Sequence, residues 1–209
     1  MPDQIVKLFT DLEVKSKIKN KLPKLFQIAE IENQKGGKIG MQVGTTRENI
    51  ITALLIDTFG ESNVDFNIPI NKPEVDVRVF EIPYSIKTLS DKGLNGLKLI
   101  WSGDSEQATL FRNNYVPSCG IIFTHIQWDK IGGFYYIPLS CQKEIFEEVG
   151  RENYIKLLTK GTNNRGVELY SSALKKLLSH QNTWKIEIKW ERQPINYQPY
   201  TRWIELWQQ

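Results

Sequence analysis

The chain has 209 residues, a formal net charge of +3 and a hydrophobic fraction of 40%, with no long polar tract of low complexity. It is therefore long enough to bury the core of a compact domain, and its composition excludes a disordered chain. No apolar run approaches the ~18 residues that a membrane-spanning helix needs, and charges are spread over the first twenty residues, which argues against a signal peptide. We expect one domain over residues 1–209, no membrane association and a location in the cytoplasm.

Cysteine and histidine are too sparse and too widely spaced for a zinc site. The chain has Cys119 and Cys141 without a CxxC pair, and its two histidines, His125 and His180, are far apart in sequence. Each cysteine lies next to apolar residues or at the start of a helical pattern. We predict two buried, reduced thiols and no nucleophilic cysteine.

The first 45 residues are predicted to form a helical part that ends in a glycine-rich loop. Residues 3–33 have a helical apolar pattern, which Pro23 should interrupt. The basic loop over residues 35–44 contains Lys38, which can hold a phosphate, and Met41. An apolar side chain among lysines suits a wedge that enters the minor groove and unstacks a base step. The alternative is a methionine that packs back onto the core.

A helix is predicted over residues 47–59, because the apolar residues have helical spacing and Gly60 marks the end. Glu48 lies in its first turn. The segment from Thr45 to Glu48 fits a capping box, which would give this carboxylate a structural role. The alternative is a carboxylate that contributes to a metal site.

A β-hairpin is predicted to bring a carboxylate and an amine together. Apolar and polar residues alternate over 75–80, which predicts a strand with Asp76 on the polar face. Residues 81–83 are few enough for a tight turn, and Ser85 and Lys87 share one face of the returning strand over 84–88. Asp76 and Lys87 should therefore converge.

This pair has the chemistry of a metal-dependent nuclease. A carboxylate oxygen is a natural Mg²⁺ ligand, and Mg²⁺ commonly uses one or two carboxylates together with substrate phosphate oxygens. An adjacent lysine can orient or deprotonate the attacking water and offset charge on the phosphate. Such a short pattern is weak by itself. The alternative is a hairpin with an incidental aspartate and a solvated lysine.

The rest of the chain alternates between strand and helix patterns, which predicts an α/β (α+β) fold with a mixed central sheet flanked by helices. The helix that begins near Asp104 places Glu106 in its first turn, where the helix dipole alone would favour an acid. We assign residues 46–140 to a catalytic core and residues 141–209 to a basic part for DNA binding and dimerisation. Strands are predicted over 98–101, 119–128, 134–138 and 183–190, and helices over 104–111, 142–150 and 169–178.

The last quarter of the chain is electropositive. Residues 151–209 carry 10 basic and 5 acidic side chains, which favours affinity for phosphates. In the loop over 161–166, Arg165 can bind guanine in bidentate fashion, while Asn163 or Asn164 suits adenine or a phosphate. The alternative for this loop is an ordinary turn.

The strand over 183–190 adds further basic candidates. Lys185 and Lys189 lie on the face opposite its tryptophans, and Arg192 follows, so these residues can track a DNA backbone or line a dimer cleft. Trp203 and Trp207 are four residues apart and share one helical face. We interpret the tryptophans at this end as core or dimer contacts rather than as platforms for base stacking.

The segment from Pro73 to Lys87 resembles the signature of the PD-(D/E)xK nucleases, with Asp76 as the motif aspartate and Lys87 as the motif lysine. Ser85 occupies the place of the second acid. A subgroup of these enzymes has Ser-x-Lys there and takes the carboxylate from the following helix. The resemblance then implies Asp76 and Glu106 as metal ligands, although the gap from Lys87 is longer than in the subgroup. Glu48 is the second candidate, because the superfamily often places a glutamate on the helix ahead of the aspartate strand.

Nearly the whole chain resembles the ThaI-type restriction endonucleases. The resemblance rests on residues 21–30, 36–44, 82–88 and 160–168 and on the tryptophan-rich end. It implies a small homodimeric type II enzyme with a PD-(D/E)xK core that uses Mg²⁺ to cut double-stranded DNA at a short palindrome of CGCG type, leaving blunt ends. A cognate DNA methyltransferase is expected in the same system, although not as a bound partner, because self-DNA must be protected.

Two alternatives remain open from the sequence. A repair or recombination nuclease on the same fold would cut by DNA structure without base preference. A noncatalytic DNA-binding module would have lost the second acid, and Ser85 is the residue that favours this interpretation.

Overall fold

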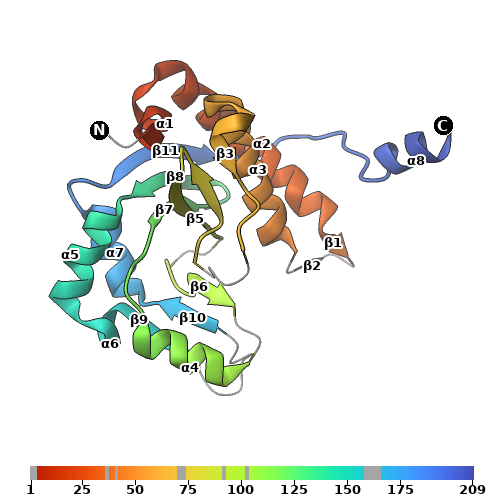
Figure 1. Cartoon of the computed structure of the whole chain (residues 1–209). Coiled ribbons are helices and arrows are strands. Elements are labelled where there is room, and N and C mark those ends of the chain that lie inside the picture. The colour runs from red at the N-terminus through yellow and green to blue at the C-terminus, as the bar shows by residue number, and fades with distance from the viewer. Residues whose placement is uncertain are drawn as a thin grey trace.

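The structure, a computed structural model, describes residues 4–35, 38–40, 42–69, 74–90, 93–101, 104–157 and 166–209, except for the side chains of Lys35 and Trp101. Helices cover both faces of a twisted mixed sheet, and the last helix lies apart at the end of an extended segment (Figure 1). The α-helices are α1 (Lys7–Thr10), α2 (Leu12–Glu32), α3 (Val43–Phe59), α4 (Ser105–Asn114), α5 (Leu139–Val149), α6 (Arg151–Tyr154), α7 (Ser171–Ser179) and α8 (Thr201–Trp207), and the 3₁₀ helices are η1 (Gln4–Val6) and η2 (Glu61–Asn63).

The strands of the described residues form three sheets. The main sheet has six strands in the order β11-β8-β7-β5-β4-β3; a smaller sheet has the order β6-β10-β9, and β1 pairs with β2. All neighbours are antiparallel except β5 and β7. The strands are β1 (Gln34–Lys35), β2 (Lys38–Ile39), β3 (Val64–Asp65), β4 (Val77–Val79), β5 (Ile82–Leu89), β6 (Lys98–Trp101), β7 (Gly120–His125), β8 (Lys130–Ile137), β9 (Ile155–Leu157), β10 (Gly166–Leu169) and β11 (Trp184–Trp190).

Side-chain alternation along the central strands builds a separate core on each face of the main sheet. On β7, Ile122 packs in the core formed with α1, α2 and α3, whereas its neighbours Ile121 and Phe123 pack in the core formed with α4 to α7. Successive side chains of a strand point to opposite faces, so a strand that is buried on both sides is apolar at every position. The predicted mixed central sheet flanked by helices is confirmed.

Pro23 does not interrupt the N-terminal helix as predicted. Helix α2 runs through it from Leu12 to Glu32, and the chain turns instead at Asp11, whose carboxylate caps α2 by accepting hydrogen bonds from the backbone N–H groups of Glu13 and Val14. Leu22 and Phe26 are buried on either side of the proline. Their packing offsets the backbone hydrogen bond that a proline removes.

The hairpin of β4 and β5, which contains Asp76 and Lys87, is also tighter than predicted. The turn consists of Phe80 and Glu81, both with positive φ, and Ile82 and Pro83 already belong to β5. Two left-handed residues match the twist of the flanking strands, and the chain accepts their conformational cost here without glycine.

None of the helices in the described part of the chain combines the length and the apolar character that crossing a bilayer requires.

Candidate active site

The site is built on the β4–β5 hairpin, where the predicted convergence of Asp76 and Lys87 is confirmed. Asp76 immediately precedes β4, and its backbone N–H donates to the Tyr84 carbonyl at 2.9 Å, which extends the antiparallel pairing. The Lys87 Nζ atom lies 2.9 Å from Asp76 Oδ2, and both side chains are largely shielded from solvent. The two charged groups are therefore held by strand pairing and not by a flexible loop.

Three donors converge on one oxygen of Asp76. In addition to Lys87, the Ser85 hydroxyl donates to Oδ2 at 3.0 Å and the Ile86 backbone N–H donates to it at 2.6 Å. Oδ1 accepts none of these three hydrogen bonds. Ser85 is buried, so its hydroxyl has a fixed place beside the carboxylate. The residue that departs from the family pattern thus orients the aspartate.

Glu48 is the carboxylate that the structure brings to this pair. Burial and the negative charge of Asp76 raise its pKa to about 7, and the positive charge of Lys87 partly opposes this effect. Glu48 therefore lies within electrostatic range of both residues, on a helix that contacts β4 and β5. The site thus contains two carboxylates and one ammonium group, so it has one positive charge fewer than it has acidic groups.

Helix α3 carries Glu48 in its second turn, because the helix begins earlier than predicted. It starts at Val43 after Gln42, whose side chain makes no capping hydrogen bond, and Thr45 lies inside the helix. The capping box proposed for Thr45 and Glu48 is therefore wrong. Helix α3 packs against β4 and β5, so a residue in its second turn can face the hairpin.

The residue before Glu48 anchors the helix on its other side. The Arg47 guanidinium donates to Glu30 Oε1 at 2.6 Å, and the Trp128 indole donates to the same oxygen at 2.8 Å. Arg192 donates to Glu30 Oε2 at 2.8 Å. Burial lowers the pKa of Arg47, while its pairing with Glu30 opposes that shift. This cluster ties α3 to α2 and to the segment after β11.

Glu106 does not join the site. After β5 the chain leaves the main sheet, forms β6 of the small sheet and then enters α4, which packs against β9 and β10 (Figure 1). Glu106 is exposed in the first turn of α4. Within the described residues, no group of three His, Cys, Asp or Glu side chains is placed to hold a metal ion. The structure therefore does not bring Glu106 to Asp76, whereas Glu48 lies within electrostatic range of it. Which of the two carboxylates joins Asp76 stays a prediction.

Comparisons with known proteins identify the family of the chain. The family model described as "Restriction endonuclease ThaI" matches residues 8–209. The chain belongs to the ThaI restriction endonuclease family. A solved structure described as "Restriction endonuclease in complex with substrate DNA" is 44% identical, covers 99% of each chain and superposes with a TM-score of 0.91. No curated protein matches the chain.

Within this ThaI-family fold, the cations predicted on β11 are paired with acids. Lys185 lies 2.8 Å from Glu187 and Lys189 pairs with Glu191 at 2.5 Å, and Arg192 belongs to the Glu30 cluster. Strands β8 and β7 separate β11 from β5, so the structure does not bring these cations to Asp76. Lys38 is exposed on β2. Met41, Asn163, Asn164 and Arg165 lie outside the described residues.

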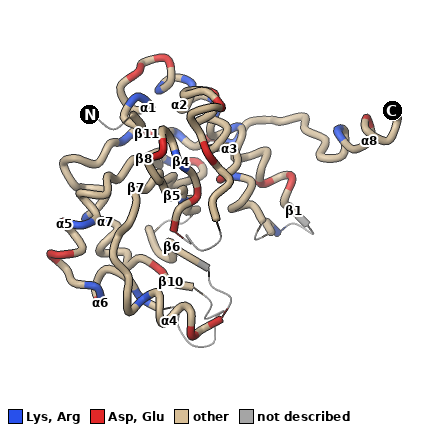
Figure 2. The backbone as a smooth tube through the Cα atoms, in the orientation of Figure 1, with Lys and Arg blue, Asp and Glu red and all other residues tan. Residues whose placement is uncertain are grey.

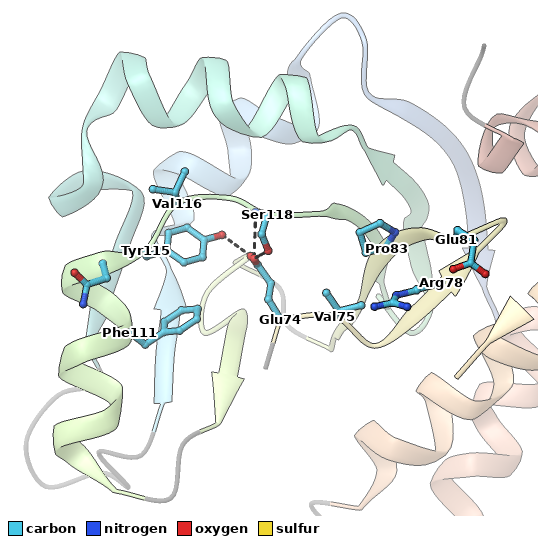
Figure 3. A pocket seen from close by; sticks show the side chains of 10 residues that line it. Glu74, Val75, Arg78, Glu81, Pro83, Phe111, Tyr115, Val116 and Ser118 are labelled. Carbon is cyan, nitrogen blue, oxygen red and sulfur yellow. Dashed lines mark hydrogen bonds between the residues drawn. The ribbon is translucent and has the colours of Figure 1, made fainter. Parts of the chain in front are cut away.

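Sequence reasoning missed the role of Glu74, which the motif contains but which had no assigned partner. Figure 3 shows its carboxylate pointing at Tyr115 and Ser118. The Tyr115 hydroxyl donates to Glu74 Oε1 at 2.7 Å, and the Ser118 backbone N–H donates to Oε2 at 3.2 Å. Burial and the Glu74 charge raise the pKa of Tyr115. These contacts tie the segment before Asp76 to the loop after α4, at the wall of a cavity of about 640 Å³. No sequence signal links residues so far apart.

Proposed function

We propose that this protein is a Mg²⁺-dependent type II restriction endonuclease that hydrolyses phosphodiester bonds of double-stranded DNA at a short palindrome. The observation that carries the proposal is the placement of Asp76, Glu48 and Lys87. It supplies two hard oxygen ligands and one amine at a site with one more negative than positive charge. The family and the DNA complex of the similar structure support the substrate class.

The donor set fits a divalent cation. Mg²⁺ prefers carboxylate oxygens, commonly takes one or two from the protein, and completes its shell with water and phosphate oxygens. Asp76 and Glu48 would hold it. When bound, it would supply Lewis acidity to the phosphate and lower the pKa of a coordinated water. The proton on Glu48 must leave before that carboxylate can bind a cation, and Asp76 already has Oδ2 oriented by three donors.

Residues around the cation site would position the water and the Asp76 carboxylate. Lys87 orients the attacking water and offsets the negative charge that builds up on the phosphate. Ser85 and the Ile86 backbone N–H keep the Asp76 carboxylate in place. The water oxygen loses a proton to the solvent as it forms a bond to phosphorus, the bond from phosphorus to the 3′ oxygen breaks, and that oxygen takes up a proton from the solvent. The products are a 5′-phosphate and a 3′-hydroxyl.

The family resemblance also supports a proposal for how the protein recognises DNA and assembles. A two-fold site is read by a two-fold protein, so we propose a homodimer acting on a CGCG-type palindrome with blunt ends. Lys38, Lys185 and Lys189 are proposed to contact phosphates. We also propose contacts to the bases: Met41 would unstack a base step, Arg165 would bind a guanine edge, and Asn163 or Asn164 would bind an adenine edge or a phosphate. A cognate methyltransferase would protect the host DNA in the cytoplasm.

The test is cleavage of a long unmethylated DNA of known sequence by the purified protein, with Mg²⁺ and with EDTA, followed by sequencing of the ends. Asp76→Ala serves as the inactive control. Discrete Mg²⁺-dependent fragments with one terminal sequence support the proposal. Cuts without a common sequence would indicate a structure-specific nuclease, and intact DNA that is nevertheless bound would indicate a noncatalytic module.

A further inference from the structure

Glu74 is a buried carboxylate that lies two residues before Asp76 and is only 5% exposed. The Tyr115 hydroxyl donates to Oε1 at 2.7 Å, and the backbone N–H and the hydroxyl of Ser118 both donate to Oε2 (Figure 3). The Cys119 thiol donates to the main-chain carbonyl of Glu74 at 3.8 Å. A carboxylate that is removed from water needs such donors, so these contacts fix the chain at residue 74.

The loop that receives this carboxylate, residues 115–119, is itself held by two helices. Arg151 on α6 donates from Nε to the Tyr115 carbonyl at 3.1 Å. Gln142 on α5 donates from its side-chain amide to the Cys119 carbonyl at 2.7 Å. The position of the loop is therefore fixed independently of the residues that precede β4.

The same loop leads directly into β7, the strand that pairs in parallel with β5. This pairing begins at Gly120 and Tyr84, one residue before Ser85. Through the loop, Glu74 is therefore tied to a defined place along the strand that carries Ser85 and Lys87. The two partners of the Asp76 carboxylate and the anchor that precedes it thus share one frame.

Strand pairing alone holds Asp76 on one side only. Its backbone N–H donates to the Tyr84 carbonyl of β5 at 2.9 Å. On the other side, the edge strand β3 pairs with the last two residues of β4 and stops short of Asp76. Within the described residues, the contacts of Glu74 supply the second attachment of this segment. Hydrogen bonds define direction as well as distance, which an apolar contact would not do.

The contacts of Glu74 also keep its oxygens engaged. Figure 2 shows acidic residues on and beside β4 and β5. A second carboxylate so close to Asp76 would compete for a cation if its oxygens were free. Both oxygens of Glu74 accept hydrogen bonds from the 115–119 loop, so Glu74 is placed to support the site and not to bind the cation.

We propose that Glu74 is a positioning residue, whose anchorage in the 115–119 loop fixes the Asp76 carboxylate relative to β5. That Asp76 binds a cation rests on the proposed function, whereas the positioning is a property of the protein without metal. Loss of one donor to Glu74 should therefore loosen the Asp76 carboxylate without unfolding the sheet.

The test compares three variants of the full chain. Tyr115→Phe and Ser118→Ala each remove a hydroxyl that donates to Glu74. Tyr154→Phe is the matched control. The Tyr154 ring is also buried and stacks on Tyr115 with the centroids 6.1 Å apart, but its hydroxyl has no hydrogen-bond partner among the described residues. The control thus removes a buried hydroxyl from the same core without removing a donor to Glu74.

The first measurement is amide hydrogen exchange in EDTA, followed residue by residue by NMR. The Ile86 backbone N–H donates to the Asp76 carboxylate, so its exchange rate reports how firmly that carboxylate is held. We expect Tyr115→Phe and Ser118→Ala to accelerate this exchange about fivefold, equivalent to one ordinary hydrogen bond, and Tyr154→Phe to leave it unchanged. The amides of β8 and β11 should exchange at the same rate in every variant.

The second measurement is the binding of Mn²⁺ to the DNA-free protein, followed by the loss of the free Mn²⁺ signal in electron paramagnetic resonance. The residues that orient a metal ligand typically change metal affinity by about 10–100-fold, and Glu74 acts one step further from the cation. We therefore expect the Mn²⁺ dissociation constant of Tyr115→Phe to rise about tenfold, at the lower end of that range, and that of the control to stay the same.

Unchanged Ile86 exchange in both hydroxyl variants, equal acceleration in the control or throughout the main sheet, or an unchanged Mn²⁺ affinity would overturn the proposal. An unaltered chain that binds no Mn²⁺, together with faster Ile86 exchange in Tyr115→Phe, would contradict the proposed function and would support the positioning role of Glu74.

Discussion

Two neighbouring residues of α3 enter two charge clusters of opposite design. Arg47 joins Glu30 and Arg192, where one buried carboxylate receives two guanidinium groups and an indole N–H. Glu48 lies within electrostatic range of Asp76 and Lys87, where two carboxylates accompany one ammonium group. The first cluster has an excess of positive charge and every carboxylate oxygen is paired. The second lacks positive charge, and it is the one that we assign to catalysis.

The contrast separates an ionic cluster that holds the fold from one that is arranged to receive a cation. Breaking a buried pair by removing one partner is strongly destabilising, because the remaining charge has lost its compensation. Relieving two like charges in one site has the opposite effect. The Arg47 cluster should therefore govern stability, and the Glu48 cluster should govern activity at some cost in stability.

The largest effect is expected for Asp76→Ala. It removes a proposed cation ligand together with the acceptor of three hydrogen bonds, so cleavage should fall by about 10³-fold or more while DNA binding is largely retained. Single-turnover cleavage and a gel shift with Ca²⁺ measure the two properties. Asp65→Ala, on the adjacent strand β3, is the matched control and should cut normally. Substantial cleavage by Asp76→Ala would remove the basis for the site.

Arg47→Ala tests the structural cluster. Its side chain is only 6% exposed, so its loss should lower the free energy of unfolding by about 3–5 kcal/mol, or the Tm by roughly 6–20 °C. The Arg192 side chain is 46% exposed, and Arg192→Ala should cost about 1 kcal/mol or less. Thermal unfolding of both variants measures the difference. Equal losses would show that burial does not distinguish the two guanidinium groups.

Glu48→Gln should stabilise the cation-free protein in a pH-dependent way. The folded-state pKa of Glu48 is about 7, above the ordinary value of 4.5, so between these values the folded state binds more protons than the unfolded state. This contribution is present at low pH and is lost as the pH rises through about 7.

The Tm of Glu48→Gln in EDTA should therefore exceed that of the unaltered protein by about 2–4 °C near pH 8, the shift expected for ~1 kcal/mol of a partly exposed group. The difference should vanish below about pH 4.5. A difference that does not change with pH would contradict the proposed electrostatic origin.

The smallest effect is expected for Ser85→Ala. It removes one of three hydrogen bonds to Asp76 and leaves Lys87 and the Ile86 N–H in place, so cleavage should fall about fivefold, equivalent to one ordinary hydrogen bond. The single-turnover cleavage rates of Ser85→Ala and the unaltered protein measure this loss. A loss as large as that of Asp76→Ala would mean that Ser85 takes part in the reaction directly.

Local patterns predicted the hairpin well because strand alternation and a short turn determine which side chains share a face. Asp76, Ser85 and Lys87 meet as expected for this reason. The six-stranded sheet could be anticipated in outline from apolar, β-branched runs such as β7. The short strands β9 and β10 gave no comparable signal, since three or four residues carry little periodicity.

The third member of the site could not be chosen from sequence alone. Glu48 and Glu106 both have the pattern of a first-turn acid, and their distances from Asp76 depend on where each helix packs. Helix α3 begins one turn earlier than predicted, so Thr45 cannot cap it. Strand β6 belongs to a second sheet, and the helix that follows it, α4, therefore packs away from the hairpin. Both are tertiary effects that no local pattern contains.

We propose that Glu48, and not Glu106, completes the metal centre with Asp76. We would compare cleavage by Glu48→Ala and Glu106→Ala under single-turnover conditions with saturating Mg²⁺, using the same unmethylated substrate. We expect a loss of at least about 10²-fold for Glu48→Ala and a rate within about twofold of the unaltered protein for Glu106→Ala. Near-normal cleavage by Glu48→Ala together with an inactive Glu106→Ala would contradict it.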